Sequence, residues 1–455
     1  MSVTGSDETG IAPPRALARV KAFLADGSDH SLARRMAGTA FLIRVASAAI
    51  AYLSQVLLAR WMGASEFGVY VYVWTWVLLI GGLGDIGLSL AAQRFIPEYA
   101  GRQALAHLRG FLAGSRWLAL GVATALAAVA ALGVTALAPW LDRAVTVPLY
   151  IACASLPFYA LTGVQDGIAR SYNWTNLALL PPFVVRPLLM IALMGAGVAL
   201  GLRVDAVTAI LAAVAATWLT GLGQLLAINR RLRREVAPGP REYAPRIWLA
   251  TSFPIFMVEG FYLLLTNTDI LVLQQFGAPD QVAVYYAATK TLALVAFVSF
   301  SVAAATAHRF TEYHVAGDRE RLAAFVRQAV RWTFWPSLAA TLVMLALGKP
   351  FLWLFGPRFV EGYPVMFVFA LGLLARAAVG PVERVLNMLG EQRICAAIYA
   401  GAFALSLVLC LVLIPRLGPM GAALATATAL VTESVVLFWV TRRRLGLRML
   451  AWGRP

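Results

Sequence analysis

The sequence predicts an all-α polytopic membrane protein with twelve transmembrane helices, arranged as two parallel six-helix repeats around a central cavity. Three observations support this fold class. Of the 455 residues, 60% are hydrophobic and only 13% are charged, whereas soluble domains are nearer half apolar and a quarter charged. The apolar residues gather in stretches of about 20, the length that a helix needs to cross a bilayer. The two halves of the chain also share matching loop segments.

The apolar stretches follow one another along the chain, separated by short polar loops. A polar tail (1–33) precedes the first stretch, a basic segment (230–246) separates the sixth from the seventh, and a basic tail (442–455) follows the last. This order predicts an N-lobe over 34–229 and a C-lobe over 247–441. The expected limits of the twelve stretches are 36–61, 66–92, 110–134, 146–168, 174–199, 205–228, 247–273, 281–306, 328–348, 362–386, 394–415 and 418–441.

The basic residues indicate the orientation of these spans. Most of the 38 Lys and Arg lie in the two tails and in alternate loops. The opposite loops hold only Arg60, Arg143, Arg203, Lys349, Arg358 and Arg416. By the positive-inside rule both termini are cytoplasmic, which predicts a multi-pass protein of the inner (cytoplasmic) membrane. The basic balance is then explained by topology and by contact with anionic membrane lipids. A nucleic-acid partner is not expected, because no soluble basic domain exists to bind one.

Residues 82–87 read GLGDIG, which fits the G-x-G-x-x-G fingerprint of a dinucleotide-binding turn. The segment lies inside the second apolar stretch, follows no strand and has no acidic residue about 20 positions later, so the fingerprint is not functional here. We expect the glycines at 81, 82, 84 and 87 instead to loosen a membrane helix or to let a neighbouring helix pack closely.

The chain contains an internal repeat. LLARWMGASEFGVYVYV (57–73) is similar to LVLQQFGAPDQVAVYYAA (271–288), with Gly63 corresponding to Gly277. Because each half has six predicted spans, an even number, both halves enter the membrane in the same direction. Parallel repeats of this kind place a binding site near the middle of the membrane between the halves, as in transporters.

The two ends of the chain resemble a known family. The opening RRMAGTAFLIRVASAAIAYLSQVLLARWMGASEFGVYVYVWTW, followed by GLGDIGLSLAAQRFIPEYAG, resembles the start of Wzx-type oligosaccharide flippases. NMLGEQRICAAIYAGAFALSLVLCLVLIPRLGPMGAALATATAL resembles their penultimate two helices. The resemblance covers about residues 34–440 and extends to the superfamily of drug-exporting antiporters and the lipid II flippase. It implies a substrate: an oligosaccharide on polyprenyl pyrophosphate, moved from the inner to the outer leaflet for surface polysaccharide synthesis.

Four basic residues lie deep within the predicted spans, and we interpret them as substrate-binding residues. Arg and Lys in a cavity can offset the cost of moving a pyrophosphate through hydrocarbon. Structural pairing with a carboxylate is the alternative for each of them. Prolines or a Gly-Pro pair follow or flank two of them, which predicts helix kinks beside these charges. The four residues are Arg44, Arg186, Lys290 and Arg376.

Four intramembrane carboxylates, Asp85, Glu259, Asp269 and Glu433, are candidates for coupling to H⁺ or Na⁺. Asp269 could alternatively be solvated near the outer surface. The repeat brings Arg44 of span one within one position of Glu259 of span seven. These two opposite charges could therefore pair across a closed cavity.

The sequence predicts no enzyme, no metal site and no cofactor. Its three cysteines lie in apolar runs, and its four histidines lack metal-ligand spacing. Two alternatives to the flippase stay open. A cation-coupled drug or small-molecule exporter of the same superfamily would favour an acidic cavity. A membrane-embedded polysaccharide polymerase or ligase usually needs a large outer loop, whereas the longest ones here are 135–145 and 349–361. A flippase could also associate with polysaccharide polymerase machinery.

Overall fold

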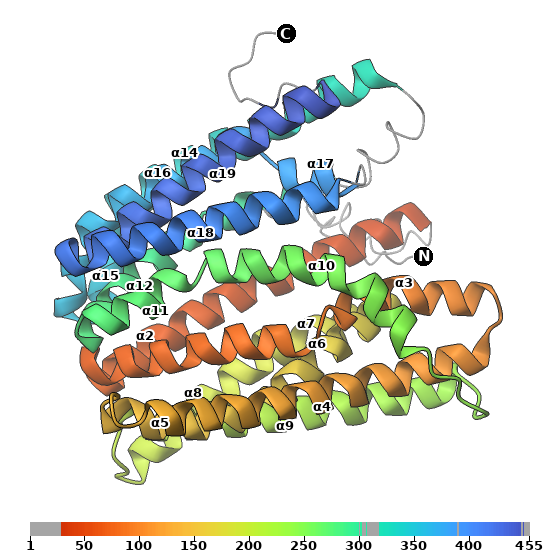
Figure 1. The fold of residues 1–455 in the computed structure, drawn as a ribbon, viewed down its shortest axis with the longest axis horizontal. Coiled ribbons are helices and arrows are strands. Elements are labelled where there is room, and N and C mark those ends of the chain that lie inside the picture. The colour runs from red at the N-terminus through yellow and green to blue at the C-terminus, as the bar shows by residue number, and fades with distance from the viewer. Residues whose placement is uncertain are drawn as a thin grey trace, which may run out of the picture.

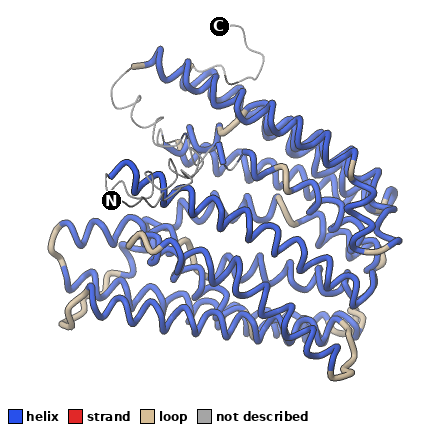
Figure 2. The backbone as a smooth tube through the Cα atoms, turned by 180° about the vertical axis from the view of Figure 1, so that it is seen from behind, coloured by secondary structure: helices blue, strands red, loops and turns tan. Residues whose placement is uncertain are grey.

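The computed structural model describes residues 29–299, 301–302, 306, 318–388, 391–446 and 449. All regular secondary structure in this part of the chain is helical, as Figure 2 shows. The predicted site residue Arg44 belongs to a described helix, but its side chain lies outside the described residues. Its expected pairing with Glu259 therefore stays a prediction.

The first half of the chain (34–229) begins with a long helix and continues through antiparallel neighbours joined by short turns. Two of the helices begin at an aspartate that caps the helix: Asp142 accepts a hydrogen bond from Ala144 N, and Asp205 from Thr208 N. The elements are α2 (Asp29–Gly84), α3 (Leu88–Gly101), α4 (Leu105–Leu137), α5 (Arg143–Cys153), α6 (Leu156–Ser171), α7 (Thr175–Leu180), the π-helix η1 (Pro181–Val185), α8 (Arg186–Ala199) and α9 (Ala206–Glu235).

The second half (247–441) has the same character. Gly418, at φ 56°, separates its last two helices, because a left-handed residue ends the helix before it. The elements are α10 (Pro245–Leu265), α11 (Thr268–Phe276), α12 (Pro279–Ala293), α14 (Arg319–Ala346), α15 (Gly348–Phe355), the 3-10 helix η2 (Pro357–Gly362), α16 (Tyr363–Val379), α17 (Val382–Met388), α18 (Gln392–Leu417) and α19 (Pro419–Leu445).

Within the described residues, ten helices are long and apolar enough to cross a membrane, or up to eleven if the bent pair α5–α6 is one span. The first of the ten, Val45–Gly101, is interrupted at Gly63, whose φ of 75° and ψ of 170° are not helical. Its counterpart Gly277 also lies at a break, between α11 and α12. The all-α polytopic fold class is thus confirmed. The count of twelve spans and the cytoplasmic termini stay predictions.

Several predicted spans are interrupted in the structure, and two of these interruptions were expected: the one at the proline pair of span five and the one at Gly380-Pro381 of span ten, where α16 ends. The proline pair of span five begins the π-helix Pro181–Val185, which is the predicted kink. Span four bends by 47° between α5 and α6, where Pro157 stands in the first turn of α6. Span seven ends its first helix at Leu265, and Asn267 donates a side-chain hydrogen bond back to Leu263 O at 2.8 Å. A side chain that competes for a helix carbonyl favours such an end.

Glycines in and beside GLGDIG allow close packing of neighbouring helices, one of the two roles expected of them. A Cβ on Gly81 would stand 2.7 Å from the ring of Tyr159, and one on Gly84 would stand 3.0 Å from a neighbouring alanine side chain. Gly87 has a φ of 71° and begins α3 after a tight turn. Asp85 accepts a hydrogen bond from Gly87 N at 2.9 Å within that turn.

The two halves form two groups of helices that converge at one end and diverge towards the other, with α10 between them (Figure 1). They share one hydrophobic core at the end where α11 and α15 lie, and this core includes Leu58, Phe67, Tyr285 and Phe355. Two other cores belong to the separate halves, except that Trp248 of α10 joins the first half's core. The halves therefore pack against each other at one end, and elsewhere each half has its own hydrophobic core.

Polar contacts also join the halves at this shared end. Arg60 donates hydrogen bonds to Leu354 O at 2.6 Å and to Trp353 O at 2.7 Å. The hydroxyls of Tyr52 and Thr291 lie 3.1 Å apart. By the predicted orientation this is the outer end of the molecule, and we name the contact region the outer seal. It consists of Tyr52, Arg60, Phe67 and Gly68 of the first half and Pro279, Thr291, Trp353 and Phe355 of the second half.

Candidate functional site

A cavity of about 580 Å³ lies among the helices of the second half and is lined by residues of α10, α11, α12, α14, α16, α17, α18 and α19. Its volume is within the range of roughly 300–1,000 Å³ that is usual for ligand sites. Five of the eight candidate residues line it: Glu259, Asp269, Lys290, Arg376 and Glu433. The fold thus brings together residues that are up to 174 positions apart in the chain.

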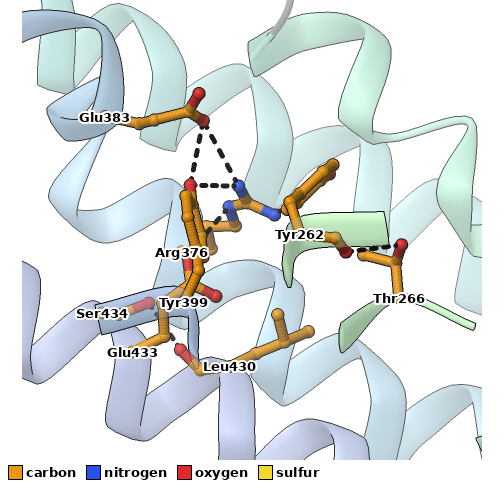
Figure 3. Close-up of polar contacts among 8 residues, drawn as sticks. All are labelled: Tyr262, Thr266, Arg376, Glu383, Tyr399, Leu430, Glu433 and Ser434. Carbon is orange, nitrogen blue, oxygen red and sulfur yellow. Dashed lines mark hydrogen bonds and ion pairs between the residues drawn. The ribbon is translucent and has the colours of Figure 1, made fainter. Parts of the chain in front are cut away.

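Arg376 is the centre of a polar network in this cavity (Figure 3). Its Nε lies 3.8 Å from Glu433 Oε1, and its Nη2 lies 3.7 Å from Glu383 Oε2. Its Nη1 donates to Tyr262 OH at 3.3 Å, and its Nη2 donates to Tyr399 OH at 3.4 Å. Tyr399 OH in turn donates to Glu383 Oε2 at 3.0 Å. One guanidinium is therefore shared by two carboxylates and two phenols.

These ion pairs are looser than direct charge-assisted hydrogen bonds, which are usually about 2.7–2.9 Å long. The side chain of Glu433 is fully buried, and neither of its carboxylate oxygens has a hydrogen-bond partner among the described residues. Burying a charge without hydrogen bonds is costly. Glu433 is thus stabilised mainly by the charge of Arg376. The carboxylate can still bind a cation or a proton, and the guanidinium can still donate to an anion at closer range.

Asp269 lies elsewhere in the lining of the same cavity and accepts three hydrogen bonds. Its Oδ2 accepts hydrogen bonds from Tyr285 OH at 2.5 Å and from Thr426 Oγ1 at 3.1 Å. Its Oδ1 accepts from Ile270 N at 2.9 Å. The residue is only 4% exposed, so it is not the solvated surface carboxylate that its position in the sequence also allowed.

Lys290 faces this carboxylate from α12. Its Nζ lies 5.2 Å from the ring centroid of Tyr286, and Asp269 is the charged group that interacts with it electrostatically. The described part of the chain contains no direct ion pair for Lys290. The cation is therefore balanced at a distance rather than neutralised by contact.

The cavity is formally acidic. Its lining contains two cations, Lys290 and Arg376, and four carboxylates, Glu259, Asp269, Glu383 and Glu433. The sequence argument had expected basic residues of both halves to dominate a central cavity. The helical period shows which residues share a face, but it does not show how each helix is rotated about its axis, and that rotation decides which charges meet.

Arg186 lies in the first half, outside this cavity. It is the first residue of α8, directly after the π-helix, and its guanidinium lies 5.2 Å from the ring centroid of Tyr159 and 5.8 Å from that of Trp74. Tyr70 stacks on Trp74 with an interplanar angle of 13°. The cation lies beside two aromatic rings, one of which stacks on a third, and the described residues include no carboxylate paired with it. Arg186 is thus a partly exposed cation on an aromatic wall.

Asp85 lies in the turn between α2 and α3, also outside the cavity lining. It is close enough to Glu259 and Asp166 to interact with both electrostatically. The charge of Asp85 in the first half is therefore coupled electrostatically to the acidic cavity, since Glu259 lines that cavity from α10.

The sequence argument did not identify Glu383 or Tyr399. Glu383 comes after Gly380, whose φ of 69° ends α16 and turns the chain back, so that Glu383 returns to Arg376. No periodicity could predict this contact, because it depends on the direction in which the short helix α17 leaves the turn.

Comparisons with known proteins agree with this architecture. A family model described as polysaccharide biosynthesis protein matches residues 35–314, and a model described as MatE matches residues 254–412. No curated protein matches the chain.

Solved structures show the same fold. One is an inward-facing multidrug resistance MATE family transporter of the MOP superfamily, with a TM-score of 0.70 and 16% identity over 89% of this chain and 98% of that one. Another is the lipid II flippase MurJ, inward closed, with a TM-score of 0.69 and 15% identity over 88% and 87%. A third is a MOP superfamily transporter from Pyrococcus furiosus, described as having a binding pocket of reverse polarity, with a TM-score of 0.67 and 15% identity over 90% of this chain and 95% of that one.

These structural likenesses establish the fold. The first family model extends over more than half of the 455 residues, and the chain therefore belongs to the polysaccharide biosynthesis protein family.

Proposed function

We propose that the protein flips a polyprenyl-pyrophosphate-linked oligosaccharide from the inner to the outer leaflet of the cytoplasmic membrane by alternating access. Membership of the polysaccharide biosynthesis family supports this substrate class. A flippase must offer the anionic pyrophosphate of its substrate a cation that is not already neutralised by a carboxylate, because an unpaired charge in hydrocarbon is costly. The arrangement of cations decides where that group binds.

The observation that carries the proposal is the contrast between two arginines. Arg376 is held by Glu383 and Glu433, whereas Arg186 is surrounded by the aromatic rings of Trp74 and Tyr159. A cation on an aromatic wall keeps its donors available for bidentate contact with phosphate oxygens. Arg186 is thus the pyrophosphate anchor of the first half. Arg44 is its expected companion on span one.

The acidic cavity of the second half then serves coupling. Asp269 and Glu433 are buried carboxylates that a proton or Na⁺ would neutralise, and Lys290 and Arg376 are the counter-charges that keep them stable when no ion is bound. Ion binding to Glu433 removes one of the two carboxylate charges that share Arg376 and leaves its guanidinium only partly neutralised by Glu383, so ion binding and anion binding are linked through one guanidinium. In this scheme Lys290 and Arg376 contact the substrate only when the coupling ion is bound.

The decisive test is flipping of a pyrophosphate-linked oligosaccharide in proteoliposomes. We expect Arg186→Gln to abolish flipping and Arg186→Lys to retain a fraction, because charge is kept while the bidentate geometry is lost. Trp74→Leu should weaken flipping less than Arg186→Gln does, since it removes one aromatic ring beside the cation and keeps the cation itself. Equal loss of protein abundance and flipping in Arg186→Gln would refute the anchor role.

A cation-coupled exporter of small cationic compounds is the second candidate. The acidic balance of the cavity and the MatE match over 254–412 favour it. The same proteoliposomes distinguish the two functions. Efflux of a cationic dye that Glu433→Gln abolishes, without flipping of the lipid-linked oligosaccharide, would establish the exporter in place of the flippase.

A further inference from the structure

A second cavity, of about 460 Å³, has none of the seven described candidate residues in its lining. It is bordered by α2, α4 and α5 of the first half and reaches Gln275 of α11 in the second half. Its wall is mostly apolar, with Trp76, Val134 and Leu149 among the side chains that form it. At one end Gln275 Nε2 donates a hydrogen bond to Tyr72 OH at 3.1 Å, which joins the two halves of the chain.

The position of this cavity indicates the chemistry of its occupant. Leu137 and Trp140 border it at the predicted outer end of the spans and are 52% and 81% exposed. Apolar and tryptophan side chains that are exposed at this level of a membrane protein face hydrocarbon and the interface. An apolar cavity does not hold water well, because water needs two to four polar partners there. A hydrocarbon chain from the membrane fits this wall.

We propose that this cavity binds the isoprenoid chain of the substrate's lipid carrier in the outer half of the membrane. The inference rests on the proposed function, in which the headgroup crosses while its chain stays in hydrocarbon. The flat faces of Tyr72, Trp76 and Trp140 suit the planar, methyl-bearing units of an isoprenoid. The Tyr72–Gln275 hydrogen bond joins the two halves at this cavity, so the isoprenoid chain would lie next to a contact between the halves.

The chain carries a reporter for this cavity. Cys153 lines the cavity and is partly exposed, whereas the other two cysteines, Cys395 and Cys410, are buried. The rate at which a small apolar maleimide labels Cys153 in the full-length protein in nanodiscs therefore measures access to the cavity. Cys153→Ser identifies the background.

Polyprenyl monophosphate and phosphatidylglycerol, added at equal concentrations, separate the two sources of hydrocarbon. We expect the polyprenyl monophosphate to slow the labelling of Cys153 and phosphatidylglycerol to leave the rate unchanged. Equal slowing by both lipids would show a site for bulk acyl chains and would overturn the assignment to an isoprenoid. Unchanged labelling with both lipids would overturn the site itself.

Two glycines of α4 provide a matched pair of variants. A Cβ on Gly133, which lines the cavity, and a Cβ on Gly121, which does not, would each meet nothing within 4 Å. Gly133→Phe should fill the cavity and weaken the protection by polyprenyl monophosphate about tenfold, as expected for losing contact with roughly two methylenes. Gly121→Phe should leave the protection at the wild-type value.

Failure of this inference differs from failure of the proposed function. If the wild-type protein flips the substrate and Gly133→Phe does so with full activity, the isoprenoid site is overturned and the proposed flippase function stands. Protection of Cys153 without any flipping of the lipid-linked oligosaccharide would leave the site and overturn the flippase. If Gly133→Phe does not fold, the labelling of the wild-type protein with the two lipids decides the question alone.

Discussion

Gly68 of α2 lies directly against the backbone of Pro279 at the start of α12, so that a Cβ on Gly68 would stand 1.7 Å from the Pro279 carbonyl oxygen. The two residues belong to different halves of the chain and form part of the outer seal. Only a glycine permits this approach, because the obstacle is backbone and cannot rotate away. The contact therefore fixes how closely the halves can meet at this end.

Gly68→Ala should force the outer seal apart. We expect the open population to rise, since overpacking of a tight contact costs about 1–3 kcal/mol, which is a factor of roughly 5 to 150. Pulsed electron paramagnetic resonance between spin labels on the two sides of the seal measures the change. Gly101→Ala is the control, because a Cβ there would meet nothing within 4 Å. An unchanged distance distribution in Gly68→Ala would show that the seal is not the contact that limits closure.

Arg60→Gln should loosen the same seal by a different route. Arg60 donates to the carbonyls of Trp353 and Leu354, the last turn of α15, where a cation also meets the negative end of the helix dipole. Loss of each hydrogen bond costs about 0.5–1.5 kcal/mol, so a several-fold rise in the open population is expected by the same measurement. Arg203→Gln, an exposed basic residue on the same predicted side, is the matched control and should change nothing. A seal that stays closed in Arg60→Gln would assign closure to the remaining contacts of the seal, among them Gly68–Pro279 and Tyr52–Thr291.

Arg376→Gln should destabilise the protein more than Glu433→Gln. Removing Arg376 leaves two carboxylates, Glu383 and Glu433, without their shared cation, whereas removing Glu433 leaves Arg376 paired with Glu383. Breaking a buried pair typically costs about 3–5 kcal/mol, and the partly exposed pair with Glu383 should cost less. Thermal unfolding followed by intrinsic fluorescence gives the order.

The double variant Arg376→Gln, Glu433→Gln tests the same network. It should recover part of the stability lost in Arg376→Gln, because no buried carboxylate at 433 then lacks its partner. Strictly additive losses would show that Arg376 and Glu433 do not interact in the folded protein.

Reporter fusions should establish which side of the membrane carries the outer seal. Fusions at Gly63, Leu141 and Gly277 should report the outside, and fusions at Arg102 and Pro238 should report the cytoplasm, because the basic loops stay inside. A cytoplasmic signal at Gly277 would reverse the orientation and make the outer seal an inner one.

The family resemblance of the opening segment and of RLGPMGAALATATAL (416–430) near the end agrees with the family that the comparisons establish. Helix length and apolar content likewise predicted the polytopic all-α fold, because both are local properties of the chain. The kink before Arg186 was predictable for the same reason, since proline acts on its own helix.

The sequence by itself determined which residues are expensive to place in a membrane, and these are Arg44, Arg186, Lys290, Arg376 and the four carboxylates. Only the tertiary structure decided who their partners are. Arg376 meets Glu383 because Gly380 turns the chain back, and Arg186 meets Trp74 and Tyr159 because three helices pack around it. The physical reason is that the cost of a buried charge is a property of one side chain, whereas its neutralisation depends on the rotation and packing of helices that are distant in the chain.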